Sequence, residues 1–328
     1  MAEKETRIYT ANMPLHPFLF MGCWNKPSEG HHAVLQAILE RPEKILILGG
    51  DNAYSDKQTQ IMNYEFVFGE HEKLRTKEKF VALGNHNLND PATLRQEKQY
   101  HNDPAMHWNM PDNYYCYTFQ DGYAIVVLDT SPLHFWPQTS YRGVDLTFLP
   151  AMLTWLKQTL QTLQKTNTPY YLVQHDPIVA HKHSSVRYLK EGDRILQAIA
   201  PYPPRSILCA DIHNFQEGLL EYNGQLIKQY VAGTGGGDPY DIYSIVRNAP
   251  PPKNTHRYLL ERFTSGYGFL QIQDNWKNPV EFVKVQEWSH YTRHETPRSI
   301  HPLALLRNVP PARHNTTNKA KRSHAQQV

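Results

Sequence analysis

The stretch KILILGGDNAY, residues 44–54, decides the fold expected of this chain. Its apolar run, residues 45–48, is followed by two glycines and then by Asp51. A continuous apolar run of this length predicts a strand buried on both faces, as in a parallel sheet covered by helices. A carboxylate just beyond such a strand lies where open α/β sheets form their binding sites.

The same pattern recurs along the chain, where short apolar runs alternate with segments of helical periodicity. The clearest helix is predicted at residues 149–164, with apolar side chains spaced three and four apart, and a shorter one at residues 31–40. Two late runs, residues 268–273 and 280–286, predict a hairpin. This alternation predicts an α/β fold. The predicted strands cover residues 17–21, 44–48, 80–83, 123–128, 170–173, 206–209 and 229–232.

Five of these strands end on a polar residue that can bind a metal ion. Each residue alone would be interpreted as a turn former, a helix cap or an ordinary hydrogen-bond partner. Their number and order instead indicate one site, because the carboxyl ends of the strands would converge. Oxygen, nitrogen and sulfur ligands together suit iron, zinc or manganese. The residues are Cys23, Asp51, Asn85, His175 and Asp211, with His213 two positions after the last.

The order of the motifs resembles that of the calcineurin-like metallophosphoesterases and, within them, the purple acid phosphatases. Tyr54, three residues after Asp51, and Trp24 are marks of the purple acid phosphatases. The resemblance covers residues 18–288 and implies a mixed β-sandwich flanked by helices, a four-layer arrangement. The expected phosphoesterase domain spans residues 1–288, and residues 289–328 are expected to form a C-terminal extension with a disordered basic tail. The motifs are Gly50-Asp51-Asn52-Ala53-Tyr54, Gly84-Asn85-His86, His175-Asp176-Pro177 and Asp211-Ile212-His213.

The resemblance implies two metal ions, iron together with zinc, manganese or a second iron. Asp51 would bridge both ions. Tyr54 and His213 would hold the first, and Asn85 and His175 would hold the second. His86 matches a family histidine that contacts phosphate and assists the leaving group.

Two metal-ligand positions depart from the family pattern. Cys23 stands where the family has Asp, and Asp211 stands where it has His. A thiolate and a carboxylate can both bind metal ions, so the expected ligand set retains both residues. The family also has a substrate-facing histidine in the loop after the His175 motif. His181 and His183 are candidates for that catalytic role, although neither lies at the family's spacing.

The expected reaction is hydrolysis of a phosphomonoester by a metal-bridging hydroxide. The substrate would be a phosphorylated small molecule or a phosphoprotein. Two alternatives stay open: a binding scaffold that has lost turnover, which the altered ligands favour, and a phosphodiesterase or nuclease, at which the basic tail hints.

Composition sets the remaining expectations. The chain has 328 residues, 40% hydrophobic and 20% charged, which is typical of a globular protein. A net charge of +3 argues against a nucleic-acid partner. The three cysteines cannot form a disulfide framework, and neither a secretory signal nor an apolar run of about 18 residues is evident. We therefore expect a cytoplasmic protein that does not associate with membranes.

Overall fold

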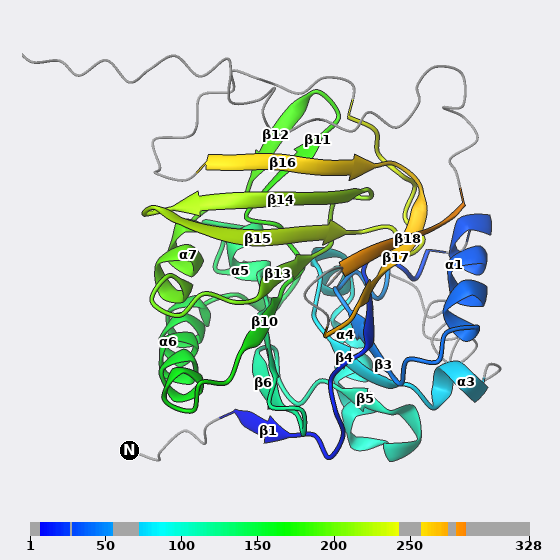
Figure 1. Ribbon diagram of the computed structural model, residues 1–328, viewed down its shortest axis with the longest axis horizontal. Coiled ribbons are helices and arrows are strands. Elements are labelled where there is room, and N and C mark those ends of the chain that lie inside the picture. The colour runs from blue at the N-terminus through cyan, green and yellow to red at the C-terminus, as the bar shows by residue number, and fades with distance from the viewer. Residues whose placement is uncertain (1–6, 27, 55–71, 243–256, 275–279, 287–328) are drawn as a thin grey trace, which may run out of the picture.

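The structure, a computed structural model, describes residues 7–26, 28–54, 72–242, 257–274 and 280–286. Two mixed sheets lie face to face in these residues, and helices cover both outer faces (Figure 1). The expectation of an α/β fold with a mixed β-sandwich flanked by helices is therefore confirmed. The expected C-terminal extension, residues 289–328, lies outside the described residues.

The six-stranded sheet contains the decisive stretch of the sequence. Its strands β2, β3, β4 and β5 are parallel, and β17 and β18 add an antiparallel hairpin beside β2. The predicted hairpin is thus confirmed. In order across the sheet, the strands are β18 (Val280–Gln286), β17 (Tyr267–Ile272), β2 (Phe18–Met21), β3 (Ile45–Leu48), β4 (Glu78–Val81) and β5 (Trp108–Asn109).

The eight-stranded sheet has a parallel centre of β7, β10, β13 and β15, with antiparallel neighbours at both sides. Two small hairpins, β8–β9 and β11–β12, stand apart from the large sheets. The large sheet runs in the order β1 (Ile8–Thr10), β6 (Tyr115–Thr118), β7 (Ala124–Val127), β10 (Tyr170–Val173), β13 (Ser206–Cys209), β15 (Gln225–Ala232), β14 (Phe215–Tyr222) and β16 (Arg257–Thr264). The hairpins comprise β8 (Ser140–Tyr141), β9 (Val144–Asp145), β11 (Val179–Lys182) and β12 (Ser185–Tyr188).

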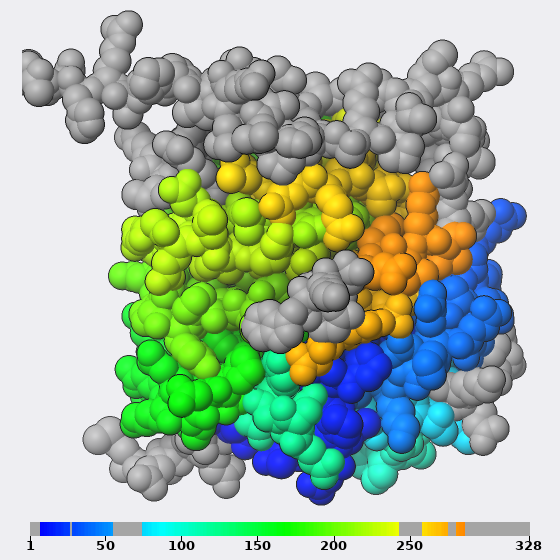
Figure 2. Space-filling view, viewed as in Figure 1, coloured from blue at the N-terminus to red at the C-terminus, as the bar shows by residue number. Residues whose placement is uncertain are grey.

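The helices lie on the outer faces. Helix α6 covers the eight-stranded sheet together with α7, and α1 packs against β17 and β18 of the other sheet (Figure 1). Figure 2 shows the hairpin of β17 and β18, in gold and orange, beside the blue surface of α1. No helix within the described residues has the length and apolar character needed to cross a membrane. The helices are α1 (Glu29–Leu39), α3 (Glu72–Arg75), α4 (Pro91–Gln99), α5 (Ser131–His134), α6 (Leu149–Lys165) and α7 (Asp193–Ile199), with short 3-10 segments at Asn85–Asn89, Tyr100–Asn102 and Pro104–Met106.

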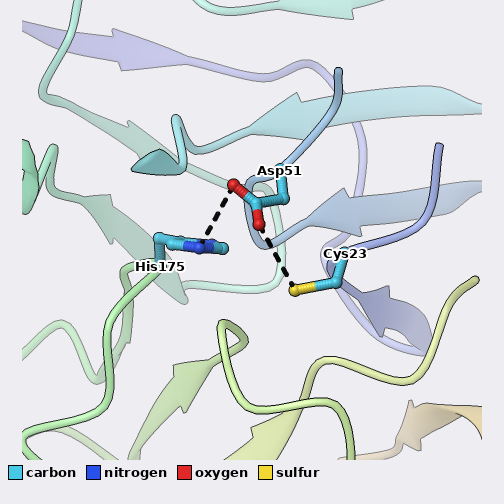
Figure 3. A group of neighbouring side chains, drawn as sticks. All are labelled: Cys23, Asp51 and His175. Atoms are coloured by element: carbon cyan, nitrogen blue, oxygen red, sulfur yellow. Dashed lines mark hydrogen bonds and ion pairs between the residues drawn. The ribbon is translucent and has the colours of Figure 1, made fainter. Parts of the chain in front are cut away.

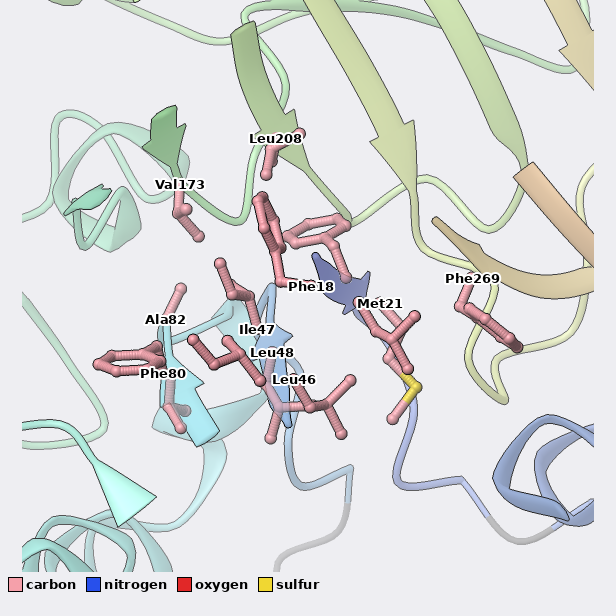
Figure 4. Packing of buried hydrophobic residues seen from close by; sticks show 14 of the residues in the cluster. Phe18, Met21, Leu46, Ile47, Leu48, Phe80, Ala82, Val173, Leu208 and Phe269 are labelled. Atoms are coloured by element: carbon pink, nitrogen blue, oxygen red, sulfur yellow. The ribbon is translucent and has the colours of Figure 1, made fainter. Parts of the chain in front are cut away.

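The central strands are apolar throughout because both of their faces are buried. In β10, Tyr171 and Val173 face the core between the sheets, whereas Tyr170 and Leu172 pack beneath the helices. This alternation is the period of two expected of a strand. Figure 4 shows the core between the sheets, where Phe18 and Ile47 of one sheet meet Val173 and Leu208 of the other. The core fixes the two sheets against each other and so positions their strand ends.

Candidate metal centre

The polar residues singled out in the sequence follow strands of both sheets. Strands β2, β3 and β4 are parallel neighbours in the six-stranded sheet, and β10 and β13 are parallel neighbours in the eight-stranded sheet. Because parallel strands present their carboxyl ends at one edge, each sheet contributes one group of side chains. The residues after these strands are Cys23, Asp51, Asn85, His175 and Asp211, respectively.

Asp51 lies at the centre of this cluster. Its Oδ2 is 3.8 Å from the Cys23 sulfur, and its Oδ1 is 3.3 Å from His175 Nε2 (Figure 3). The backbone N–H of His86 donates a hydrogen bond of 2.9 Å to Oδ1. Cys23, Asp51 and His175 are all buried, and their ligand atoms lie within 4.8 Å of one another. A metal ion could therefore contact donors from both sheets at this point.

A hydrogen bond at Nδ1 orients the His175 ring, so that its Nε2 is directed toward oxygen atoms. Its Nδ1–H donates a hydrogen bond of 2.8 Å to the carbonyl oxygen of Gly49. Its Nε2 then faces Asp51, Asn85 Oδ1 at 3.2 Å and Asp211 Oδ1 at 3.9 Å. A ligand histidine in a metalloprotein is oriented in this way, by a partner on the nitrogen that does not bind the metal.

His213 has the same arrangement. Its Nδ1 lies 2.9 Å from the carbonyl oxygen of Asp238, and its Nε2 is 3.4 Å from the hydroxyl of Tyr54. A side chain at position 237 would collide with the ring, because a Cβ built on Gly237 would lie 2.4 Å from it. The glycine thus makes room for the His213 ring.

Electrostatics favour a cation beside Asp51. Burial opposes ionisation of Asp51, but the charge and hydrogen bond of His175 keep its pKa below the usual value. Burial also opposes protonation of His175, yet Asp51, Asp176 and Asp211 raise its pKa to about 10. The carboxylates therefore stabilise positive charge at the His175 ring, and they would also stabilise a bound cation.

Three further donors, Cys23, Tyr54 and His213, are uncharged at neutral pH. Burial, together with the charges of Asp51 and Asp211, raises the pKa of the Cys23 thiol well above its usual value. Burial also raises the pKa of Tyr54 and lowers the pKa of His213 to about 4. A thiol and a phenol must lose their protons to bind a metal ion, so metal binding here would release protons.

His86 lies at the edge of the cluster and is half-buried. Its ring packs against Tyr54, with 4.7 Å between the ring centres. The side-chain amide Nδ2 of Asn89 lies 3.0 Å from His86 Nδ1 and donates to it. Asn89 in turn accepts a hydrogen bond from Tyr141. These contacts leave the proton of His86 on Nε2.

His181 and His183 belong to the β11–β12 hairpin. His181 is buried, its ring lies 5.9 Å from that of Tyr258, and its backbone N–H and carbonyl are both bonded to Gln216. His183 packs on Tyr240, whose ring also stacks on the His213 ring, with 4.6 Å between their centres. His181 thus makes packing contacts, and the ring of Tyr240 separates His183 from His213 of the cluster. Their catalytic roles stay predictions.

Four residues without a predicted role complete the site. Arg187 forms an ion pair with Asp211, with 2.6 Å between Nη1 and Oδ2. His134 donates to Asp176 across 2.6 Å. Glu97, from α4, accepts hydrogen bonds from two asparagines in the motif loops. Only Asp176 lay inside a sequence motif; Arg187, His134 and Glu97 lie on separate elements, and no local pattern indicates that they reach the site.

Burial and the neighbouring Asp176 carboxylate raise the pKa of Asp211, and the guanidinium of Arg187 opposes that rise. Asp176 is also buried, but its bond to His134 holds its pKa well below the usual range. The part of the site contributed by the eight-stranded sheet is therefore a network of alternating charges.

Residues 16–215 match the family model described as calcineurin-like phosphoesterase. A search of curated proteins gives no match. Among solved structures, the chain resembles GAP50, the anchor in the inner membrane complex of Plasmodium, with a TM-score of 0.59 and 15% identity over 90% of this chain and 94% of that one.

The chain is also similar to the purple acid phosphatase PPD1 from yellow lupin (Lupinus luteus) seeds. The TM-score is 0.59 and the identity 12%, over 85% of this chain and 54% of the lupin chain. The chain therefore spans about half the length of that enzyme. At such low identities, both similarities show a shared fold.

Proposed function

Because the chain belongs to the calcineurin-like phosphoesterase family, we propose that it is a phosphatase that hydrolyses phosphomonoesters with two bound metal ions. One observation supports this proposal most strongly. His175 and His213 each donate a hydrogen bond from Nδ1–H to a backbone carbonyl, and each directs Nε2 at an oxygen atom that could bind a metal ion. A structural role can account for one histidine held in this way. Two such histidines, both from the eight-stranded sheet and directed at Asp51 and Tyr54, are typical of a metal centre.

The donor set fits two ions that share Asp51. Cys23, Tyr54 and His213 would complete the first site, and Asn85, His175 and Asp211 the second. The mixture of sulfur, oxygen and nitrogen favours iron, zinc or manganese over magnesium or calcium. When bound, such a pair of ions supplies the charge that acidifies water and binds phosphate oxygens.

His86 would act on the substrate. With Nδ1 occupied by Asn89, its Nε2–H is available to donate a hydrogen bond. A donor at the edge of the cluster can hold a phosphate oxygen or give its proton to the departing alkoxide. The substrate in this proposal is a phosphorylated small molecule or a phosphoprotein.

The test is hydrolysis of an aryl phosphate by metal-free protein reloaded with iron, zinc or manganese. We expect turnover with at least one metal combination and its loss, by 100-fold or more (on the order of an essential catalytic group), in Asp51→Asn. Asp274→Asn is a matched control, because this exposed carboxylate follows β17 at the opposite end of the sheet from Cys23. Equal activity in native protein and Asp51→Asn would refute the assignment.

A second candidate is a binding scaffold without turnover. Two observations favour it: Cys23 and Asp211 depart from the expected ligands, and a solved structure with the same fold is described as an anchor. Metal-loaded protein that binds inorganic phosphate but hydrolyses neither phosphomonoesters nor phosphodiesters would replace the enzyme proposal with this one. Turnover of a diester alone would instead indicate a phosphodiesterase.

A further inference from the structure

Arg187 reaches the candidate metal centre from a hairpin outside both large sheets. Strand β12 carries it and is paired with β11, where Arg187 lies opposite Ala180. Its guanidinium contacts Asp211 at 2.6 Å, and its side chain is 35% exposed whereas that of Asp211 is 8% exposed. The pair therefore lies at the boundary between the buried cluster and the surface.

The guanidinium lies closer to Asp211 than to the neighbouring carboxylate of Asp176. Asp176 accepts a hydrogen bond of 2.6 Å from His134 and another of 2.6 Å from the hydroxyl of Thr130. Arg187 Nη2 lies 3.7 Å from Asp176 Oδ1 and 3.2 Å from His134 Nδ1. Asp176 thus has two closer partners of its own, and the shortest contact of Arg187 is with Asp211.

The two oxygens of Asp211 have different surroundings. Oδ2 is bonded to Arg187, whereas Oδ1 lies 3.9 Å from His175 Nε2. Two ligands at about 2.0–2.2 Å from one metal ion are separated by at most about 4.4 Å, so Oδ1 and Nε2 could bind the same ion. The ion pair therefore leaves one carboxylate oxygen available on the side of the metal centre.

We propose that Arg187 is a positioning residue, which orients Asp211 as a ligand of the second metal ion and cancels its charge. This inference rests on the proposed function, since it places a metal ion beside His175. An ion pair of Asp and Arg carries no net charge, as a neutral imidazole carries none. The pair thus supplies a ligand oxygen without adding negative charge that would repel an incoming phosphate.

The test is a double-mutant cycle read out by binding of inorganic phosphate to the metal-loaded protein, measured by calorimetry. In the native background, Arg187→Met should weaken phosphate binding about tenfold, because it exposes the dianion to an uncompensated carboxylate. In the Asp211→His background, the same change should have an effect of less than about twofold. Arg187→Lys, which keeps the charge, should restore most of the affinity. Arg262→Met, which removes another ion pair between an arginine and a carboxylate, that with Glu217, is the control and should leave phosphate binding unchanged.

Equal weakening in both backgrounds would overturn the inference, because Arg187 would then contact phosphate directly. An increase in bound metal ions per chain in Arg187→Met, determined by elemental analysis, would also overturn it, because Arg187 would then keep Asp211 from the metal. The proposed function can fail independently of this inference. If no variant hydrolyses aryl phosphate but the double-mutant cycle gives the expected result, the enzyme proposal fails and the positioning role of Arg187 stands.

Discussion

Three of the residues that follow buried strands share a left-handed backbone conformation. Cys23 has φ 52°, Asp51 has φ 53° and Asp211 has φ 56°. Asp adopts this region more readily than most residues, whereas Cys does so at a higher cost. Backbone strain of this kind is concentrated at functional sites, where the surrounding structure enforces it. The recurrence of one turn at three strand ends, across both sheets, supports a common role for these side chains.

The role of Cys23 can be tested by spectroscopy. If its thiolate binds a metal ion, cobalt(II)-loaded protein should show an intense near-ultraviolet absorption from sulfur-to-cobalt charge transfer. Cys23→Asp should lose this band while still binding cobalt, because a carboxylate replaces the thiolate. Cys209→Ser serves as the control, since Cys209 is also buried but lies within β13. A band that persists in Cys23→Asp would exclude Cys23 as a ligand.

His181 should make the fold sensitive to acid. Burial lowers its pKa to about 4, from an ordinary value of 6.5. The unfolded chain therefore takes up a proton at higher pH than the folded chain, and the stability contributed by the neutral ring is lost as pH falls from 6.5 toward 4. Between pH 7 and pH 5, this one residue should account for about 2 kcal/mol of lost unfolding free energy.

Urea unfolding of native protein and His181→Gln at both pH values checks this expectation. The glutamine variant should lose about 2 kcal/mol less than native protein on acidification. An equal loss would mean that His181 is protonated in the folded state, and it would then remain the stronger candidate for a catalytic acid.

The sequence was most informative about residues whose position depends on their own strand. Asp51 and His175 come just after buried runs, so their positions at the carboxyl ends of β3 and β10 could be predicted from the sequence. That these two ends meet depends on the packing of one sheet on the other. Arg187 could not be predicted in this way. Its contact with Asp211 depends on the position of a small hairpin, and its neighbours in the sequence contain no motif.

At the scale of elements, α4 ties the motif loops together. Its Glu97 is buried and accepts a hydrogen bond of 2.7 Å from Asn52 and one of 2.6 Å from Asn87. Asn52 also accepts from the Trp24 indole at 2.8 Å. One carboxylate thus connects the loops after β3 and β4, and through Asn52 the loop after β2. These loops carry the donors from the six-stranded sheet.

Replacing Glu97 should therefore loosen the fold and the site together. Glu97→Ala leaves two buried amide groups without this acceptor, which should lower the unfolding free energy by about 3 kcal/mol. Glu97→Gln keeps one acceptor oxygen and should cost less. Urea unfolding of the metal-free variants measures both effects. A loss below about 0.5 kcal/mol in Glu97→Ala, the range of a surface substitution, would show that the network does not support the loops.

Strands that are buried throughout and helices with one buried face were predicted well. Strands that combine buried apolar residues with exposed polar ones were not. The run at residues 45–48 is β3, and the predicted helix at residues 149–164 is α6 with one further residue. The strand expected at residues 229–232 is instead the end of a longer β15, Gln225–Ala232. Its first half mixes polar with apolar and exposed with buried residues, and its partner β14 carries Gln216, Glu217 and Glu221 among apolar residues. The continuous apolar run that predicts buried strands is therefore absent there.

At the scale of the whole molecule, the candidate metal centre requires both sheets. Cys23, Asp51 and Asn85 follow strands of the six-stranded sheet, and His175 and Asp211 follow strands of the eight-stranded sheet. Metal ions at this site would therefore bind only when the two sheets are packed together. Since a ligand that binds the folded state alone stabilises it, free metal at 100 times its dissociation constant should add about 2.7 kcal/mol per site.

The central claim is that Asp51 joins two metal ions at the ends of both sheets. Titration of metal-free protein with zinc or manganese, with ions per chain determined by calorimetry and elemental analysis, tests it most directly. We predict two ions per chain in the native protein and a loss of at least one in Asp51→Asn, with Asp274→Asn unchanged. Native protein that binds no metal ion, or an Asp51→Asn variant that binds two ions as tightly as native protein, would contradict the claim.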